Sequence, residues 1–317
     1  MTRMRWVRTA VATSVVVTLP FLARLDSGAT SSPTDAANAV ILVTGGDIAC
    51  DPAAHGSDGS DPTVCQHAAT AELLAGADAV LPLGDLQYPD GTLEQFQGAY
   101  DPTWGVHASV SYPAVGNHEY HVPGAAGYFD YWSGKDRPTG DRDAGYYSFD
   151  LDSWHVISLN SNCSEVACGE GTPQNDWLEA DLAATSSSCV LAFWHHPLFN
   201  SGAVHGASMS SGVRELWHDL YGAGVDVVLN GHEHNYQRYA KQDPEGRATA
   251  DGIREFVVGT GGSRIYPLLG AKDSNYETGQ DTSFGVLRMR LDRDAYSWEF
   301  VAIDGTVRDA GGPVACN

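Results

Sequence analysis

Residues 40–47 read VILVTGGD, an apolar run that ends in two glycines and an aspartate. An apolar run with a polar end returns along the chain as LPLGDLQY (81–88), PAVGNHE (113–119), LAFWHHP (191–197) and VVLNGHEH (227–234). Each run predicts a buried strand, and ligands in α/β folds bind beyond the carboxyl ends of strands. We therefore expect one site built from five strand ends. Its candidate side chains are Asp47, Asp85, Tyr88, Asn117, His195, His232 and His234.

The residue types at these strand ends are those of metal ligands. Carboxylate and phenolate oxygens suit a hard trivalent ion, and imidazole nitrogens suit zinc or ferrous iron. Two adjacent cations can clamp a phosphoryl group and turn a bound water into hydroxide. A single Gly-Asp or His-x-His would be weak support, but five segments with these residue types in this order predict a dinuclear metal centre.

The remaining sequence predicts an α/β (α+β) fold with two mixed β-sheets packed as a sandwich and flanked by helices. Strands that alternate with helices imply parallel β units, and a hairpin signal and a β-rich tail add a second sheet. The expected strands are 40–44, 79–83, 146–150, 154–160, 190–194, 225–229, 255–258, 284–291 and 296–303. The expected helices are 66–75, 92–100, 173–183 and 213–221.

Three short motifs carry a resemblance to a known family: GDLQY (84–88), GNHE (116–119) and GHEH (231–234). Together they resemble the purple acid phosphatase family within the calcineurin-like metallophosphoesterase superfamily, over roughly residues 40–305. The histidine of the usual Asp-x-His opening is missing, because the chain reads Asp47-Ile48-Ala49, and Tyr88 supplies a ligand instead. Ala49 also departs from the glycine that usually ends the family's first motif. The resemblance implies a four-layer metallophosphoesterase-like fold.

The resemblance also implies how the two metal ions are held. A ferric ion would be bound by Asp47, Asp85, Tyr88 and His234. Asp85 would bridge to a divalent ion (Fe, Zn or Mn), which Asn117, His195 and His232 would also hold. Of the adjacent histidines, His195 is the implied ligand because it lies two residues before a proline. His196 would point to the opposite face if the strand continued through both.

His118 and His205 are the expected catalytic and substrate-binding residues. In the family, the histidine that corresponds to His118 binds the phosphate and assists the leaving group, and His205 has the spacing of a second substrate histidine. Gly259-Thr260-Gly261-Gly262 lacks the Gly-Lys-Ser/Thr of a nucleotide-binding loop, although it can still lie near the metals.

The implied function is that of a secreted phosphatase that hydrolyses phosphate monoesters by attack of a metal-activated hydroxide. A ferric ion acidifies bound water more than a divalent ion does, which favours an acid phosphatase. The alternatives are a metal-dependent phosphodiesterase or nucleotide hydrolase and, less favoured, a non-catalytic extracellular binding protein. The sequence makes no prediction about oligomeric state.

Residues 1–39 have the order of a secretory signal followed by a linker. Arg3, Arg5 and Arg8 precede an apolar stretch from Thr9 to Leu22, and small residues follow. Cleavage after residue 29 or after residue 39 fits equally well, and an uncleaved anchor helix is the minority alternative. We expect the catalytic domain at residues 40–317 and no stable membrane association after cleavage.

Six cysteines follow the expected signal, and an even number in an exported protein suggests disulfides. Local spacing favours Cys50 with Cys65 and Cys163 with Cys168, which leaves Cys189 for Cys316. The net charge of −22 would become −24 without residues 1–39, which hold four arginines and two aspartates. Such a surface repels polyanions, so we expect a small phosphate ester as the partner and no docking of nucleic acid.

Overall fold

The computed structural model describes residues 39–317 except 57–58, 60, 62–63 and 206–210. The expected signal and linker therefore lie, apart from residue 39, outside the described residues. Among the residues described, no helix is long and apolar enough to cross a membrane.

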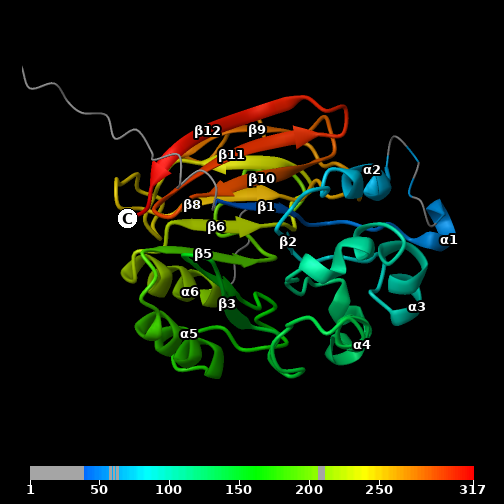
Figure 1. Cartoon of the computed structure of the whole chain (residues 1–317), viewed down its shortest axis with the longest axis horizontal. Helices are drawn as coiled ribbons and strands as arrows, with labels where there is room; N and C mark the ends of the chain where they lie inside the picture. The colour runs from blue at the N-terminus through cyan, green and yellow to red at the C-terminus, as the bar shows by residue number, and fades with distance from the viewer. Residues whose placement is uncertain (1–38, 57–58, 60, 62–63, 206–210) are drawn as a thin grey trace, which may run out of the picture. The chain divides into compact units, whose positions relative to one another are not determined.

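Two mixed sheets form the centre of the fold, as predicted (Figure 1). Within them β1 runs parallel to β2, and β4, β5, β6 and β8 run parallel to one another, whereas the remaining pairings are antiparallel. In spatial order the first sheet consists of β12 (Val307–Ala315), β11 (Ala295–Ala302), β10 (Gly285–Leu291), β1 (Val40–Gly45) and β2 (Ala79–Pro82). The second consists of β3 (Tyr147–Leu151), β4 (Trp154–Ser158), β5 (Cys189–Trp194), β6 (Val227–Asn230), β8 (Arg254–Val258), β7 (Tyr236–Tyr239) and β9 (Tyr276–Gln280).

The core consists of three apolar layers. Neighbouring residues of one strand belong to different layers, because successive side chains point to opposite faces of the sheet. In β1, Leu42 belongs to the layer that also contains Leu191 and Phe256 of the second sheet. Its neighbour Val43 belongs to a second layer, together with Phe96 and other residues of the helical segments. A third layer joins the far face of the second sheet to α5 and α6. Strands β2, β4, β5 and β6 therefore have both of their faces buried.

The helices occupy the two outer layers of this arrangement. In Figure 1 α5 and α6 lie together beside β5, and α3 and α4 lie on the opposite side of the view. The stretch expected as one helix over 92–100 begins as α3 and continues as a π-helix over Phe96–Tyr100. The helices are α1 (Pro52–His55), α2 (His67–Glu72), α3 (Leu93–Gln95), α4 (Ala126–Ser133), α5 (Pro173–Ala184) and α6 (Ser211–Gly222).

Strand β12 was not predicted, because its sequence VRDAGGPVA contains residues that usually interrupt strands. It is an edge strand paired only with β11, so Pro313 removes no bond from the sheet interior. Gly311 is required there by packing: a Cβ atom at this position would lie 2.3 Å from Cζ2 of Trp298.

The three expected disulfides are all present, and no cysteine is free. They join Cys50 to Cys65, Cys163 to Cys168 and Cys189 to Cys316. The third links the first residue of β5 to the tail beyond β12, and it therefore connects the two sheets.

Candidate metal centre

The candidate ligands are positioned by strand ends, with one exception to the expected pattern. Asp47 follows β1, Asp85 follows β2, His195 follows β5 and His232 follows β6. Asn117 does not follow a strand, since the segment before it makes only isolated bridges, such as Leu83 with Ala114. That segment still runs beside β2, which brings Asn117 to the same edge.

Three of these residues have a left-handed backbone, with φ of 59° at Asp47, 48° at Asp85 and 70° at His232. This conformation costs a non-glycine residue roughly 1–2 kcal/mol, and such residues cluster at functional sites. Hydrogen bonds compensate for the strain: Asp47 N–H donates to the carbonyl of Gly84 at 3.1 Å, and His232 N–H donates to Oδ2 of Asp47 at 2.8 Å. The turns are thus held by the backbone and by one of the ligand side chains.

Four of the candidate side chains converge around the hydroxyl of Tyr88. This oxygen lies 2.9 Å from Oδ1 of Asp47, 3.1 Å from Oδ2 of Asp85 and 3.1 Å from Nε2 of His234. Nε2 of His234 is also 3.2 Å from Oδ1 of Asp47. These are the four residues that the resemblance assigns to one metal ion.

The remaining candidates converge around His195, and Asp85 belongs to both groups. Nε2 of His195 lies 3.3 Å from Oδ2 of Asp85, 3.1 Å from Oδ1 of Asn117 and 3.2 Å from Nδ1 of His232. All seven candidates therefore meet in two adjacent sets with one shared carboxylate.

The hydrogen bonds of the outer imidazole nitrogens show that this donor set fits cations. Nδ1 of His195 lies 2.8 Å from the carbonyl oxygen of Leu83, and Nδ1 of His234 lies 2.7 Å from that of Arg264. Each Nδ1 must carry the proton, so each Nε2 of a neutral ring turns a lone pair inward. Carboxylate, amide oxygen and imidazole lone pairs then face one another with too few protons between them, an arrangement that a cation stabilises.

The pKa shifts of the site also indicate that its donor set fits cations. Burial raises the pKa of Tyr88 well above its ordinary value, and the charges of Asp47 and Asp85 raise it further. Burial acts to raise the pKa of Asp85 as well, but His195 and His118 outweigh it and hold that pKa well below its usual range. Burial acts to lower the pKa of His195, yet the charge of Asp85 raises it to about 9. The buried carboxylates therefore favour positive charge at the site, and a bound cation would favour loss of the proton of Tyr88.

His118 and His205 both line a cavity of about 240 Å³ above the candidate ligands. Nδ1 of His118 lies 2.5 Å from the carbonyl oxygen of Pro89, which leaves Nε2 on the side of Asp85, 3.9 Å from Oδ2. The ring of His205 stacks on His232 with 4.1 Å between centroids. Both side chains are partly exposed, so each can reach a bound molecule.

His196 lies closer to the site than expected. The prediction of opposite faces assumed a continuous strand, but β5 ends at Trp194 and the chain bends there. The ring of His196 lies 4.3 Å from that of His232, and its Nδ1 is 2.8 Å from the hydroxyl of Ser161. His196 nevertheless does not line the cavity.

Two buried glutamates hold the turns that carry the site. Glu119 accepts backbone hydrogen bonds from Asp85, Leu86, Gln87 and Gly116, so it ties the turn after β2 to the one that carries Asn117.

Glu233 points away from the ligands. It accepts from the backbone N–H groups of Val204 and His205, and its Oε2 lies 3.2 Å from Nδ1 of His205. The two acids thus orient His205 and the ligand turns without facing the cavity.

The glycine-rich run after β8 passes beneath the site, for a steric reason. A Cβ atom at Gly259 would lie 2.2 Å from the carbonyl oxygen of Glu233 and 2.8 Å from Oδ2 of Asp47. Only glycine lets this strand end approach the ligands. The chain then continues into Ser263, Arg264 and Tyr266, which line the cavity. The motifs did not indicate these three residues, and the glycine run was the one available signal.

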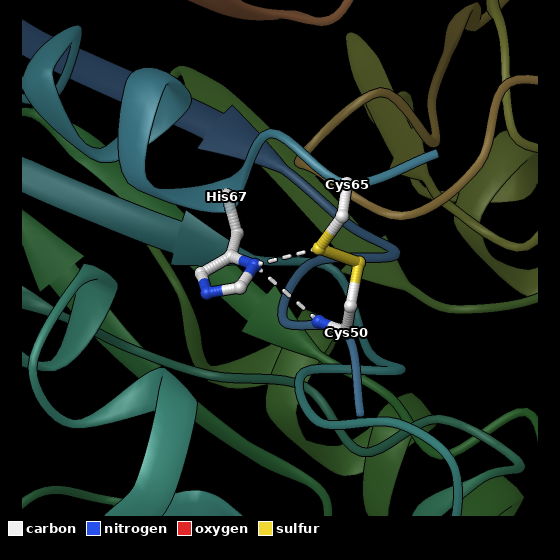
Figure 2. Close-up of side chains that lie close together, drawn as sticks. All are labelled: Cys50, Cys65 and His67. Carbon is white, nitrogen blue, oxygen red and sulfur yellow. Dashed lines mark hydrogen bonds between the residues drawn. A yellow bond between two sulfur atoms is a disulfide. The ribbon is translucent and has the colours of Figure 1, made fainter. Parts of the chain in front are cut away.

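The disulfide between Cys50 and Cys65 packs beside this run. Figure 2 shows the ring of His67 next to the disulfide, with Nδ1 3.2 Å from Sγ of Cys65 and 3.4 Å from the backbone nitrogen of Cys50. These three residues lie close enough to hold a metal, but both sulfurs are bonded to each other. Their role is to support Ser263, which bridges to Cys65 and whose N–H donates to the carbonyl of Asp47 at 2.8 Å.

A larger hollow, of about 460 Å³, lies elsewhere and contains none of the candidate ligands. Strands β1, β10, β11 and β12 line it, and its two arginines already have partners. Arg288 donates to the carbonyls of Leu73 and Ala75, and Arg290 pairs with Asp292. The smaller cavity is the candidate site because the convergent polar groups line it.

Comparison of the chain with known proteins gives matches to phosphoesterases. A family model described as calcineurin-like phosphoesterase matches residues 40–236. Purple acid phosphatase 22 of Arabidopsis thaliana is 32% identical over 164 residues, a segment that covers 48% of this chain but only 36% of that relative.

Two solved structures share the fold. The purple acid phosphatase PPD1 of yellow lupin (Lupinus luteus) has a TM-score of 0.71 at 19% identity, over 86% of this chain and 53% of that one. GAP50, described as the anchor in the inner membrane complex of Plasmodium, has a TM-score of 0.62 at 13% identity, over 88% and 89% of the two chains.

Proposed function

The chain belongs to the calcineurin-like phosphoesterase family, and from that premise we propose that it hydrolyses phosphate monoesters with the help of two metal ions. The observation that carries this proposal is the convergence of seven candidate ligands in two sets that share Asp85. Asp47, Asp85, Tyr88 and His234 would hold a ferric ion. Asp85, Asn117, His195 and His232 would hold a divalent ion, which is iron, zinc or manganese.

Two such cations would polarise the phosphoryl oxygens and supply a nucleophile from water at mildly acidic pH. Side chains of the protein would hold the metal ligands together and bind the phosphoryl group. Asp85 holds the two ligand sets together, since its Oδ2 lies 3.1 Å from the hydroxyl of Tyr88 and 3.3 Å from Nε2 of His195. His205 binds the phosphoryl group from the side of His232, where Glu233 fixes its ring.

His118 would protonate the departing alkoxide. Its Nδ1 proton is committed to the carbonyl of Pro89, so Nε2 is the nitrogen that gives or takes a proton in the cavity. A general acid at this position lowers the barrier most for alcohols that are poor leaving groups.

We also propose that residues 1–39 direct export and that residues 40–317 form the catalytic domain. The three disulfides support an oxidising compartment, because reduced thiols are the rule in the cytosol.

The test is metal analysis and turnover of wild type and of the Asp85→Asn variant. Asparagine keeps the shape of the side chain but removes the charge that both ions need, so we expect loss of both metals and of p-nitrophenyl phosphate hydrolysis. Asp251→Asn, at an exposed position, is the control for a lost carboxylate. A variant with two metals per chain and near-normal turnover would contradict the dinuclear site.

The same assay separates the alternatives. Faster hydrolysis of bis(p-nitrophenyl) phosphate than of the monoester by the wild type would indicate a phosphodiesterase. Bound metals without turnover of either ester would indicate a binding protein.

A further inference from the structure

Arg264 presents an unpaired guanidinium group at the rim of the metal cavity. It lines the cavity together with Ser263 and Tyr266, on a loop that contributes none of the candidate ligands. Its side chain is exposed. Among the lysines and arginines of the described residues, only Arg264 and Arg293 have a side chain with neither a hydrogen bond nor an ion pair.

The backbone on both sides of this guanidinium is fixed. The N–H of Ser263 donates to the carbonyl of Asp47 at 2.8 Å, and the N–H of Tyr266 donates to the carbonyl of His234 at 2.8 Å. The carbonyl of Arg264 itself accepts from Nδ1 of His234 at 2.7 Å. The ring of Tyr266 stacks on that of His234, with 4.1 Å between centroids. A flexible side chain therefore starts from a rigid base beside the candidate ligands.

Arg264 lines two hollows, the metal cavity and one beside it. The imidazoles of His118, His205 and His232 line the same cavity but not the adjoining hollow. Arg264, Ser263 and Tyr88 also line an adjoining hollow, whose other residues include Asp51 and His55. Arg264 thus lies at the boundary between the cavity and a space into which the rest of a substrate can extend. The carboxylate of Asp51 is engaged there in accepting from the N–H of Ala53.

The side chain of Arg264 makes no ion pair with a described residue, although acidic side chains outnumber basic ones. The chain has 40 acidic and 18 basic side chains, so carboxylates to pair with an arginine are in excess. A guanidinium offers two parallel N–H groups that match a carboxylate or a phosphate. An exposed Arg264 can therefore bind such an anion.

We propose that Arg264 is a specificity-determining residue that binds a second anionic group, a carboxylate or a phosphate, on the leaving alcohol of the substrate. The substrate class is then a phosphate monoester whose alcohol is itself negatively charged. This inference rests on the proposed phosphatase function and deepens it.

The experiment compares two substrates that differ in this one group. 3-Phosphoglycerate carries a carboxylate where glycerol 3-phosphate carries a hydroxymethyl group, and phosphate release gives kcat/KM for each. We expect the wild type to prefer 3-phosphoglycerate, and Arg264→Gln to lower this preference roughly fivefold to tenfold, the size expected for one partly solvated charged hydrogen-bonded pair. Arg264→Lys should retain part of it, since lysine keeps the charge but not the paired donors. Arg293→Gln is the matched control, because it removes the other unpaired arginine, which does not line the cavity.

Binding of phosphonates supplies a readout that does not depend on turnover. 3-Phosphonopropionate should bind the metal-loaded wild type more tightly than propylphosphonate, and Arg264→Gln should remove that difference in Kd. An equal loss on both substrates would overturn the proposal and assign Arg264 to the transferred phosphoryl group. An unchanged preference in Arg264→Gln would overturn it too.

These outcomes are distinct from failure of the proposed function. A wild type that hydrolyses both esters, with a preference that Arg264→Gln leaves unchanged, overturns only the role of Arg264. A metal-loaded wild type that hydrolyses neither ester overturns the phosphatase function and this inference with it.

Discussion

Replacing Glu119 by glutamine should disrupt the candidate metal centre, although Glu119 contacts no bound group. Its carboxylate is fully buried, and each of its oxygens accepts two backbone hydrogen bonds. Oε2 accepts from Asp85 at 3.0 Å and from Gly116 at 2.8 Å, and Oε1 accepts from Leu86 at 2.8 Å and from Gln87 at 3.3 Å. Glutamine has the same shape, but one oxygen becomes an NH₂ group that cannot accept.

The size of the effect follows from the number of donors that lose their partner. Whichever way the amide turns, two buried N–H groups face an NH₂ group. An unsatisfied buried donor costs about 1–3 kcal/mol, so we expect a loss of roughly 2–5 kcal/mol in the free energy of unfolding. One of the four donors is the backbone of Asp85 itself, so metal affinity should fall as well.

The measurement is urea unfolding of the metal-free protein, prepared with a chelator and followed by circular dichroism. It is made above pH 8, because burial and the charge of Asp85 raise the pKa of Glu119 to about 8 and the carboxylate form is the one to be tested. Without bound metal, the free energy of unfolding reports only the lost hydrogen bonds in the turns and not a change in metal binding. Glu94→Gln is the control, since Glu94 is exposed and makes no side-chain hydrogen bond among the described residues. Titration with zinc then compares the metal affinity of the two variants.

The reasoning would be refuted by a Glu119→Gln variant as stable as Glu94→Gln, within about 0.5 kcal/mol, the usual scatter of neutral surface substitutions. Such a result would mean that the glutamate is already protonated in the folded protein, because only then is glutamine an equivalent replacement.

Three further predictions follow from other contacts. If Tyr88 binds a ferric ion, the purified protein should show a broad visible absorption band, and Tyr88→Phe should bleach it at a cost of only ~1–2 kcal/mol in stability; a colourless wild type loaded with two zinc or manganese ions would argue against the ferric assignment. His118→Ala should keep its metals and lose ~10²–10⁴-fold in turnover of alkyl phosphates, with a smaller loss on aryl phosphates, whereas equal losses would exclude the acid role. The hydrogen bond that His155 donates to the carboxylate of Asp181 raises the pKa of His155. This contact therefore stabilises the fold below the unfolded imidazole pKa of about 6.5, and the stabilisation is lost as the pH rises through the folded-state pKa. His155→Gln should therefore cost about 1 kcal/mol at acidic pH and less at alkaline pH in urea unfolding, and a pH-independent cost would contradict this assignment.

The strands that carry the candidate ligands could be predicted from sequence because their signal is local. Runs such as VILVTGGD and VVLNGHEH combine a buried strand with the turn that ends it, so strand, turn and polar side chain are read together. The same applies to the hairpin of β3 and β4, where Asp152 takes the left-handed turn conformation with φ of 52°. Pairing of the cysteines was predictable for a similar reason, since two of the disulfides close short loops.

Helices and strands that form because of contacts with distant parts of the chain could not be predicted from the sequence. Helix α4 buries Tyr128, Phe129, Tyr131 and Trp132 and exposes only Asp130 and Ser133, so its polar face is too narrow to indicate a helix from sequence. Strands β7 and β9 carry weak patterns and exist because β7 pairs with both β8 and β9. Arg264 belongs to no motif, and only the folded loop brings it to the cavity.

The disulfide between Cys189 and Cys316 closes the second part of the chain into a covalent ring, because it joins residues that are 127 positions apart. A loop of this length is worth ~4–5 kcal/mol in the chain-entropy account of disulfide stabilisation. The ring includes exposed surface such as the side chain of Leu269, which is 42% accessible and open to a protease. A single cut there would leave both fragments joined through sulfur, so their mass on a non-reducing gel would not fall. A nicked molecule of this protein is thus still one molecule, and only a reductant would reveal that it had been cut.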